Sequence, residues 1–526
     1  MERERARTRV EAFALGLLAA LPLLPYLIRF ATKPLPRFTV DGDYAGLELA
    51  TQFAISGRTL LGPYSRFGFN HPGPLYFFLL KPFHALAGST TIGMFVGACA
   101  LNMLSAFTVV FASRLFAKRA HAFAALLVVF AWFGAFRQVF AHPWNPAVIA
   151  LPVLAFLILA SFFASGRTAA APVAALFGMF VTQTHMATLP MVVVVSLAAL
   201  VAFVRKTRRT GPLARSDKRS IGVAIGVIVV SILPPLIEQL TAREGNLTKL
   251  SRFFSHAPEP SKPLATAFAA FGSAIPWLPT RLAGEEAWQV LASNGESFIA
   301  SWWLPVAVWF ACVVGSVLVA RRTKDETSLG FLAISVVATV MGILSLRSVV
   351  GAIMPYLLFW TTAVTSLTWI GFLSSITNAI AERPRIGAAI AAAGALAATG
   401  VQNKHLSDHT IGYERPHEPL GKVYAALAER VRATGATPVI HPDGAWHIAL
   451  SMENELSRDG LDARVEERDR WILGRQLRTP TGAGKVFHVY TQAVNHPLRQ
   501  KACLEKLAVA DDLEVYVSPN EVSSCD

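Results

Sequence analysis

Charged residues are scarce in this sequence. Of its 526 residues, 16% are Asp, Glu, Lys or Arg, and 53% are hydrophobic. A soluble domain carries about 25% charged residues, so the composition excludes a string of ordinary soluble domains. Apolar runs of 17 to 25 residues recur between residues 11 and 402. Each is long enough to cross a hydrocarbon core of ~30 Å. Such runs stop after residue 403, where charges become frequent.

Cysteine is also rare, with four residues in the whole chain. Cys99 and Cys312 lie in apolar runs, where cysteine behaves as a small buried hydrophobe. Cys503 and Cys525 lie in the tail, where a disulfide and two free thiols are both compatible with the sequence. No cysteine spacing of the metal-binding kind occurs, and the tail has no obvious nucleophile triad or metal cluster. We therefore predict no metal site built from cysteine.

A signal-peptide cleavage site is missing after the basic N-terminus. The segment MERERARTR precedes the apolar stretch from Phe13 to Ile28, but no small-residue cleavage site follows. We therefore expect a retained first span. The apolar runs give about eleven candidate spans in all: 11–29, 91–113, 121–140, 147–165, 169–187, 188–204, 220–237, 299–320, 329–346, 352–375 and 386–402.

Lys and Arg collect in alternate loops, most densely between residues 205 and 219. The positive-inside rule makes these loops cytoplasmic, together with the N-terminus. It places residues 30–90, 141–146, 238–298 and 403–526 outside the cytoplasm. This distribution explains the net charge of +14, so no nucleic-acid partner is expected. We predict an integral multi-pass protein of a bacterial-type cytoplasmic membrane, with the lipid bilayer as its surroundings.

The predicted fold class is an all-α polytopic membrane bundle with a small C-terminal α/β soluble domain. Residues 1–402 form the membrane domain, and residues 403–526 form the extracytoplasmic domain. The tail pattern predicts helices at 420–434 and 444–458 and strands at 437–440, 463–465, 485–490 and 513–517. Alternation of strands and helices suggests a partly parallel sheet.

The two long outer loops, 30–90 and 238–298, are too apolar for disorder and too long for plain connectors. In the first loop, Pro74 to Leu86 is too short to span and has Pro82 inside it, which favours an interfacial helix. Pro263 to Ile275 is a candidate for a second interfacial helix.

Asp41 and Asp43 stand just beyond the first span. Acidic groups at this depth are costly to desolvate and usually have a purpose. Two carboxylates two residues apart suit general-base chemistry or a divalent cation, Mg or Mn, bound with a phosphate. The alternative is an N-cap for the helical segment from Tyr44 to Ile55. Taken alone, the D-x-D pattern favours the N-cap, and the residues that follow it bring the functional interpretation back.

Further polar residues follow in the same loop and at the outer ends of later spans. Gly and Pro fix turns around them, and their cations could face an anionic lipid head group. Snorkelling, turn formation and interhelical hydrogen bonds are the structural alternatives. The candidate substrate-binding residues are Glu48, Tyr64, Arg66, Asn70, His71, Lys81, Arg137, Gln183, His185, Glu238 and Arg347.

An acidic residue after the first span, followed by His71-Pro72-Gly73-Pro74-Leu75-Tyr76 and an interfacial helix, resembles the GT-C integral-membrane glycosyltransferases. The likeness is closest to the protein O-mannosyltransferase and aminoarabinose transferase branch. It covers residues 38–90 locally, and the topology is similar over most of the chain. The family usually has His-Pro-Pro-Leu and Asp-Glu. The inserted Gly73 and the Asp41-Gly42-Asp43 motif leave the subfamily and the sugar open.

The resemblance implies transfer of a sugar from a polyprenyl-phosphate donor to a glycan, lipid or protein acceptor of the cell envelope. Asp41 would be the base that deprotonates the acceptor hydroxyl, and Asp43 would orient it or help to hold a cation. Attack from the face opposite the leaving phosphate would invert the anomeric centre. Polysaccharide biosynthesis is the expected process.

Two other classes of function fit the span count. A transporter or flippase of lipid-linked sugars favours internal repeats and charged groups at the midplane, and the sequence has no repeat and almost no midplane charge. A noncatalytic envelope-assembly protein would use the tail as a binding module. Replacement of Asp41 by Asn separates the three classes.

Overall fold

The structure of the protein is a computed structural model. It describes residues 2–33, 35–38, 42–136, 139–256, 259–275, 303–376, 384–408, 418–442, 445–466, 486–493, 503–510 and 513–519. The chain divides into two compact units, which we describe separately. The first unit comprises residues 1–29, 98–236 and 251–409, and the second comprises residues 30–97, 237–250 and 410–526.

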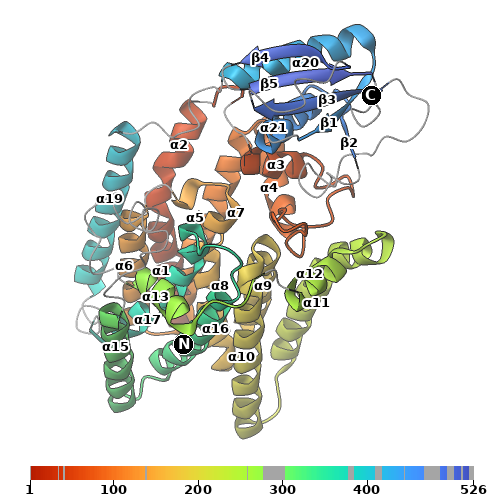
Figure 1. The fold of residues 1–526 in the computed structure, drawn as a ribbon. Coiled ribbons are helices and arrows are strands. Elements are labelled where there is room, and N and C mark those ends of the chain that lie inside the picture. The colour runs from red at the N-terminus through yellow and green to blue at the C-terminus, as the bar shows by residue number, and fades with distance from the viewer. Residues whose placement is uncertain are drawn as a thin grey trace. The chain divides into compact units, whose positions relative to one another are not determined.

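The first unit is helical (Figure 1). Its helices, some of which run on into the second unit, are α1 (Glu2–Ala20), α2 (Leu24–Thr32), α5 (Ile92–Phe116), α6 (Arg119–Ala135), α7 (Asn145–Val148), α8 (Ala150–Ala164), α9 (Ala171–Thr184), α10 (Leu189–Thr210), α11 (Arg215–Thr241), α13 (Leu264–Ala274), α15 (Trp303–Arg322), α16 (Glu326–Arg347), α17 (Phe359–Ile376) and α19 (Pro384–Asp408). Short 3₁₀ turns extend several of them: η1 (Leu21–Leu23), η2 (Val139–Ala141), η3 (Thr168–Ala170), η4 (Met186–Thr188) and η6 (Pro355–Leu358). Each of the predicted apolar runs falls on one or two of these helices.

Seven helical stretches of the described chain are long and apolar enough to cross a membrane by length and composition, and shorter apolar helices accompany them. Burial differs sharply among them. In an 18-residue apolar window of Asn145–Ala164, 89% is buried inside the protein, whereas in the corresponding window of α11 the buried share is 6%. Exposed Val and Ile side chains cost free energy in water but not against lipid tails. The chain is therefore a multi-pass membrane protein, with α8 central and α11 peripheral in its unit.

The second unit contains a five-stranded sheet with the order β2-β1-β3-β5-β4 (Figure 1). Its strands are β1 (Thr437–His441), β2 (Arg464–Val465), β3 (Val486–Ala493), β4 (Glu505–Ala510) and β5 (Leu513–Ser518). The strands β2, β1 and β3 are parallel, and β5 runs antiparallel to both β3 and β4. Helices α20 (Glu418–Thr434) and α21 (Trp446–Arg458) alternate with the first strands. The predicted mixed α/β tail is confirmed.

One strand of this sheet, β4, was not predicted. Its sequence, EKLAVA, mixes alternating apolar positions with Glu, Lys and Ala, which are depleted in strands. Pairing with β5 along Glu505 to Ala510 supplies the stabilisation that the local sequence lacks. Strand β4 therefore depends on pairing with the next strand along the chain, which its own residue propensities do not reveal.

Segments from the first outer loop share the core of the second unit. Helix α3 (Gly42–Gln52) packs its Ala45 and Leu49 into the cluster formed by α20, α21 and the sheet. Helix α4 (Leu75–Leu86) occupies the predicted interfacial segment, with Pro82 inside it. Helix α12 (Asn246–Ser255) begins in this unit. The second interfacial candidate is α13, in the first unit.

The two cysteines in the apolar runs differ from Cys503 of the tail in their bonding. Cys99 and Cys312 are free, and Cys99 is buried. Cys503 is disulfide-bonded. Cys525 lies outside the described residues.

Candidate functional site

The first turn of α3 carries Asp43. Gly42 opens the helix with φ +48°, a conformation that costs an L side chain about 1–2 kcal/mol. The phenolic hydroxyl of Tyr64 donates a hydrogen bond to the Asp43 carboxylate. A carboxylate in a first turn is also favoured by the helix dipole. Asp43 is therefore held by two local effects. Its predicted neighbour Asp41 lies outside the described residues.

A small hairpin between residues 62 and 71 positions Tyr64. The backbone N–H of Gly62 donates to the carbonyl of His71 at 3.0 Å, and that of His71 donates to the carbonyl of Pro63 at 2.8 Å. Gly and Pro make the tight turns of this segment possible. The ring of Tyr64 meets Trp446 of α21 edge to face at 5.9 Å. Arg66, at the tip, is exposed and lies 5.0 Å from the centroid of the Phe67 ring.

Asn246 ties this hairpin to a distant part of the sequence. Its side-chain oxygen accepts from the backbone N–H of Asn70 at 2.8 Å, and its amide donates to the Asn70 carbonyl at 2.8 Å. Glu238 in turn accepts from the backbone N–H of Asn246 at 2.9 Å. Asn70, Asn246 and Glu238 are all buried. The predicted residues Asn70 and Glu238 therefore belong to one buried polar network.

Glu48 lies at the centre of a second buried network, and its side chain has no exposed area. It contacts His84 Nε2 at 3.2 Å, Thr91 Oγ1 at 2.7 Å, Asn454 Nδ2 at 3.3 Å and Arg458 Nε at 3.8 Å. Burial raises the pKa of Glu48, but the hydrogen bond from His84 and the charge of Arg458 outweigh it and leave this pKa below its usual value. Glu48 is thus an ionised group inside the second unit.

Helix α21 supplies several of the partners that hold α3 in place. Gln52 donates to the Asn454 side chain at 2.8 Å and accepts from Ser457 at 2.6 Å. The backbone carbonyl of Gln52 accepts from Lys81 Nζ at 2.8 Å. Lys81 is half-buried and has two further ammonium protons. Helix α3, which carries Asp43, is therefore held by hydrogen bonds with α21 and with α4.

An ion-pair cluster ties the start of this unit to α21. Arg37 lies 2.6 Å from Glu455 and 2.7 Å from Asp459. Burial raises the pKa of Asp459, but hydrogen bonds from Tyr424 and Arg37 lower it by more. Arg37, His84, Asn454 and Arg458 were not among the predicted site residues. Only His84 carried a sequence signal, because it is a polar residue in an apolar helical run.

Of the thirteen predicted site residues, eight lie in the second unit and three in the first. Asp41 and Arg137 lie outside the described residues. In the first unit, Gln183 donates to the carbonyl of Ser231 at 2.6 Å, and His185 is buried at the end of α9. Arg347 donates to the carbonyl of Lys262 at 3.2 Å. The eight in the second unit are Asp43, Glu48, Tyr64, Arg66, Asn70, His71, Lys81 and Glu238.

Comparisons with known proteins show the fold. No protein-family model matches the chain, and no curated protein matches it. Among solved structures, the chain is similar to ArnT from Cupriavidus metallidurans bound to undecaprenyl phosphate, with a TM-score of 0.54 and 11% identity over 98% of each chain. It is also similar to ArnT from the same organism in the apo state, with a TM-score of 0.52 and 11% identity over 96% of this chain and 98% of that one.

Proposed function

We propose that this protein is an inverting GT-C glycosyltransferase of the cytoplasmic membrane, which takes a sugar from a polyprenyl-phosphate donor. The observation that carries the proposal is the ArnT-like fold over nearly the whole chain. ArnT was solved with undecaprenyl phosphate, and this lipid is a polyprenyl phosphate. That is the group released when such a donor gives up its sugar. The motif of residues 38–90 supports the same class independently.

The chemistry requires one base and a stabilised leaving group. The acceptor hydroxyl attacks the anomeric carbon, the sugar–phosphate bond breaks, and polyprenyl phosphate leaves with the bonding electron pair. In the proposal, Asp41 takes the hydroxyl proton and Asp43, held by Tyr64, orients the acceptor. Arg66 and Lys81 supply positive charge for the phosphate. A second role for Asp41 and Asp43 is to share a Mg or Mn ion, and loss of sugar transfer when a chelator is added to the assay tests this role.

The proposal includes an orientation. The second unit would lie outside the cytoplasm and the N-terminus inside, so that donor and acceptor meet at the outer face. The acceptor would be a glycan, lipid or protein of the envelope. Accessibility labelling of single cysteines at positions 43 and 208 tests this placement, because labelling of both from the same side of the membrane overturns the proposal.

The deciding experiment compares wild type with Asp41→Asn. Membranes containing either protein receive radiolabelled polyprenyl-phosphate sugars, and label is counted in lipid, polysaccharide and protein fractions. Loss of a general base lowers the rate by about 10²–10⁴-fold. The matched control is Glu326→Gln, whose side chain is 83% exposed in the first unit. Equal transfer by Asp41→Asn and the control contradicts the enzyme proposal.

The same variants test the two rival functions. A flippase with Asp41→Asn would still move lipid-linked sugar across the bilayer of reconstituted vesicles. An envelope-assembly protein would tolerate the change altogether, in transfer and in movement. Loss of transfer with retained binding of polyprenyl phosphate is the result expected of the enzyme.

A further inference from the structure

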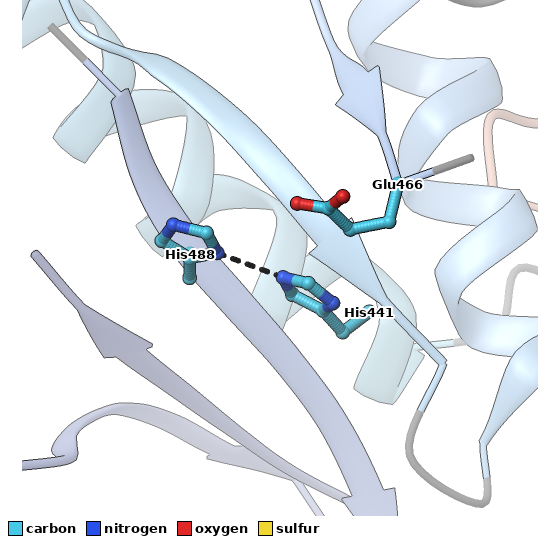
Figure 2. A group of neighbouring side chains, drawn as sticks. All are labelled: His441, Glu466 and His488. Atoms are coloured by element: carbon cyan, nitrogen blue, oxygen red, sulfur yellow. Dashed lines mark hydrogen bonds between the residues drawn. The ribbon is translucent and has the colours of Figure 1, made fainter. Parts of the chain in front are cut away.

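Three side chains with metal-binding atoms meet on the sheet of the second unit. They are His441, Glu466 and His488. Figure 2 shows the Glu466 carboxylate and the two imidazoles turned toward one another. Each residue offers one ligand atom, and these three atoms all lie within 4.8 Å of one another. His441 is buried. None of the three belongs to the site described above.

The strand register brings these residues together. The strands β2, β1 and β3 are adjacent and parallel, with Val439 paired to both Arg464 and His488. Two residues further along their strands, His441 and Glu466 come level with each other. Side chains alternate between the faces of a sheet, so His441, Glu466 and His488 share one face. The opposite face carries Ile440, Val465 and Val489 into the hydrophobic core.

The two imidazoles have nearly the separation that a shared metal requires. His441 Nε2 and His488 Nδ1 lie 2.9 Å apart. Two nitrogens bound tetrahedrally to zinc at ~2.05 Å are about 3.3 Å apart. A shift of a few tenths of an ångström therefore converts the His–His hydrogen bond into two metal bonds. The proton shared by the nitrogens would leave as the metal binds.

The rings are oriented by their surroundings. The His441 ring stacks on Tyr490 with centroids 4.6 Å apart and planes 9° from parallel. The centroids of the His441 and His488 rings lie 5.2 Å apart, and the two ring planes are 17° from parallel. Such stacking limits rotation of the imidazoles, so their nitrogens stay directed at the same point. Pre-organised ligands lose less entropy when a ligand or metal binds.

We propose that His441 Nε2, His488 Nδ1 and the Glu466 carboxylate bind one divalent transition-metal ion of the zinc class, with water completing its coordination. Two imidazoles and one carboxylate favour zinc over magnesium or calcium, which prefer oxygen ligands. Strand β2 has two residues, so its pairing with β1 is short. A metal bound across β2, β1 and β3 would fasten this edge strand to the sheet.

Zinc content of the full-length protein in detergent tests the proposal. The protein is stripped with a chelator, reloaded with zinc chloride, desalted and measured by elemental mass spectrometry. Wild type should retain about one zinc per chain. Loss of a ligand should weaken binding at least about tenfold, so Glu466→Gln and His488→Gln should each retain far less. The matched control His256→Gln removes a histidine from the first unit and should retain zinc like wild type.

Thermal unfolding separates a lost ligand from a damaged fold. Zinc should raise the melting temperature of stripped wild type and of His256→Gln, but not that of Glu466→Gln. Glu466→Gln keeps the shape of the side chain, and without zinc it should melt with stripped wild type. Equal zinc retention by wild type and Glu466→Gln overturns the proposal, as does a wild type that retains none. Neither readout depends on sugar transfer.

Discussion

Replacing Glu48 with Gln removes one charge from a buried network and little volume. His84, Thr91 and Arg458 surround the Glu48 carboxylate in the folded protein. Loss of one partner from a buried ion pair costs about 3–5 kcal/mol, because the other charge is left uncompensated. Arg458 keeps a second partner, Glu455, at 2.8 Å. We therefore expect a loss of about 3 kcal/mol, at the lower end of that range.

Hydrogen–deuterium exchange measures this loss where it arises. Backbone amides of α3 and α21 exchange through local opening, whose free energy sets their protection. A loss of about 3 kcal/mol raises their exchange rates by about 150-fold. The control is Glu505→Gln, in the same unit, whose side chain is 58% exposed and paired with Arg430. An exposed pair contributes about 0–1 kcal/mol, so this variant should exchange almost like wild type.

The pH dependence gives an independent check of the sign. The pKa of Glu48 is lowered in the folded protein, so the folded state binds this proton more weakly than the unfolded state. The stabilisation is complete above the unfolded pKa of about 4.3 and is lost as the pH falls through the folded value. Wild type and Glu48→Gln should therefore converge in protection on acidification below about pH 4.

The experiment also separates two roles for Glu48. The sequence predicts substrate binding, and the network predicts positioning of α3. If Glu48→Gln lowers sugar transfer but leaves exchange of α3 and α21 like that of Glu505→Gln, the stability argument is refuted. Faster exchange in both helices supports the positioning role.

Two further predictions concern the polar contacts around α3. Tyr64→Phe removes the hydrogen bond to Asp43. It should lower transfer about tenfold, with a stability loss of about 0.5–1.5 kcal/mol, measured by transfer assay and melting temperature; unchanged transfer contradicts the role of Tyr64. Asn246→Ala removes both side-chain hydrogen bonds to Asn70. Residues 62–71 should then be cut faster by protease. The control Thr241→Ala removes an exposed hydroxyl that donates within its own helix and should leave the cutting rate unchanged.

The membrane helices could be predicted because their signal is local. A run of about twenty apolar residues needs no partner to be recognised, and the predicted 329–346 and 352–375 spans became α16 and η6–α17. The tail elements had the same advantage wherever periodicity was clear, as in α20 and β1. Turn and cap residues set their ends within a few positions.

The partners of the candidate site could not be predicted in the same way. Glu48 meets Asn454 across 406 residues of chain, and Asn70 meets Asn246 across 176. In the sequence, each of these residues resembles any other polar residue of a helix or a turn. The motif around Asp41 and Tyr64 was recognisable because its members are close in sequence, whereas α21 contributes contacts that only the folded second unit brings to α3.

The three residues of the proposed metal site illustrate the same limit on the sheet. A search for metal spacing looks for ligands a few residues apart, and His441, Glu466 and His488 are each more than twenty residues from the next. The predicted strands 437–440, 463–465 and 485–490 already contained or adjoined all three. The strand order β2-β1-β3 could not be predicted from the sequence. Once that order is known, the two-residue period of a strand places the three side chains on one face. Candidate ligands in a parallel sheet are therefore better sought across predicted strands than along them.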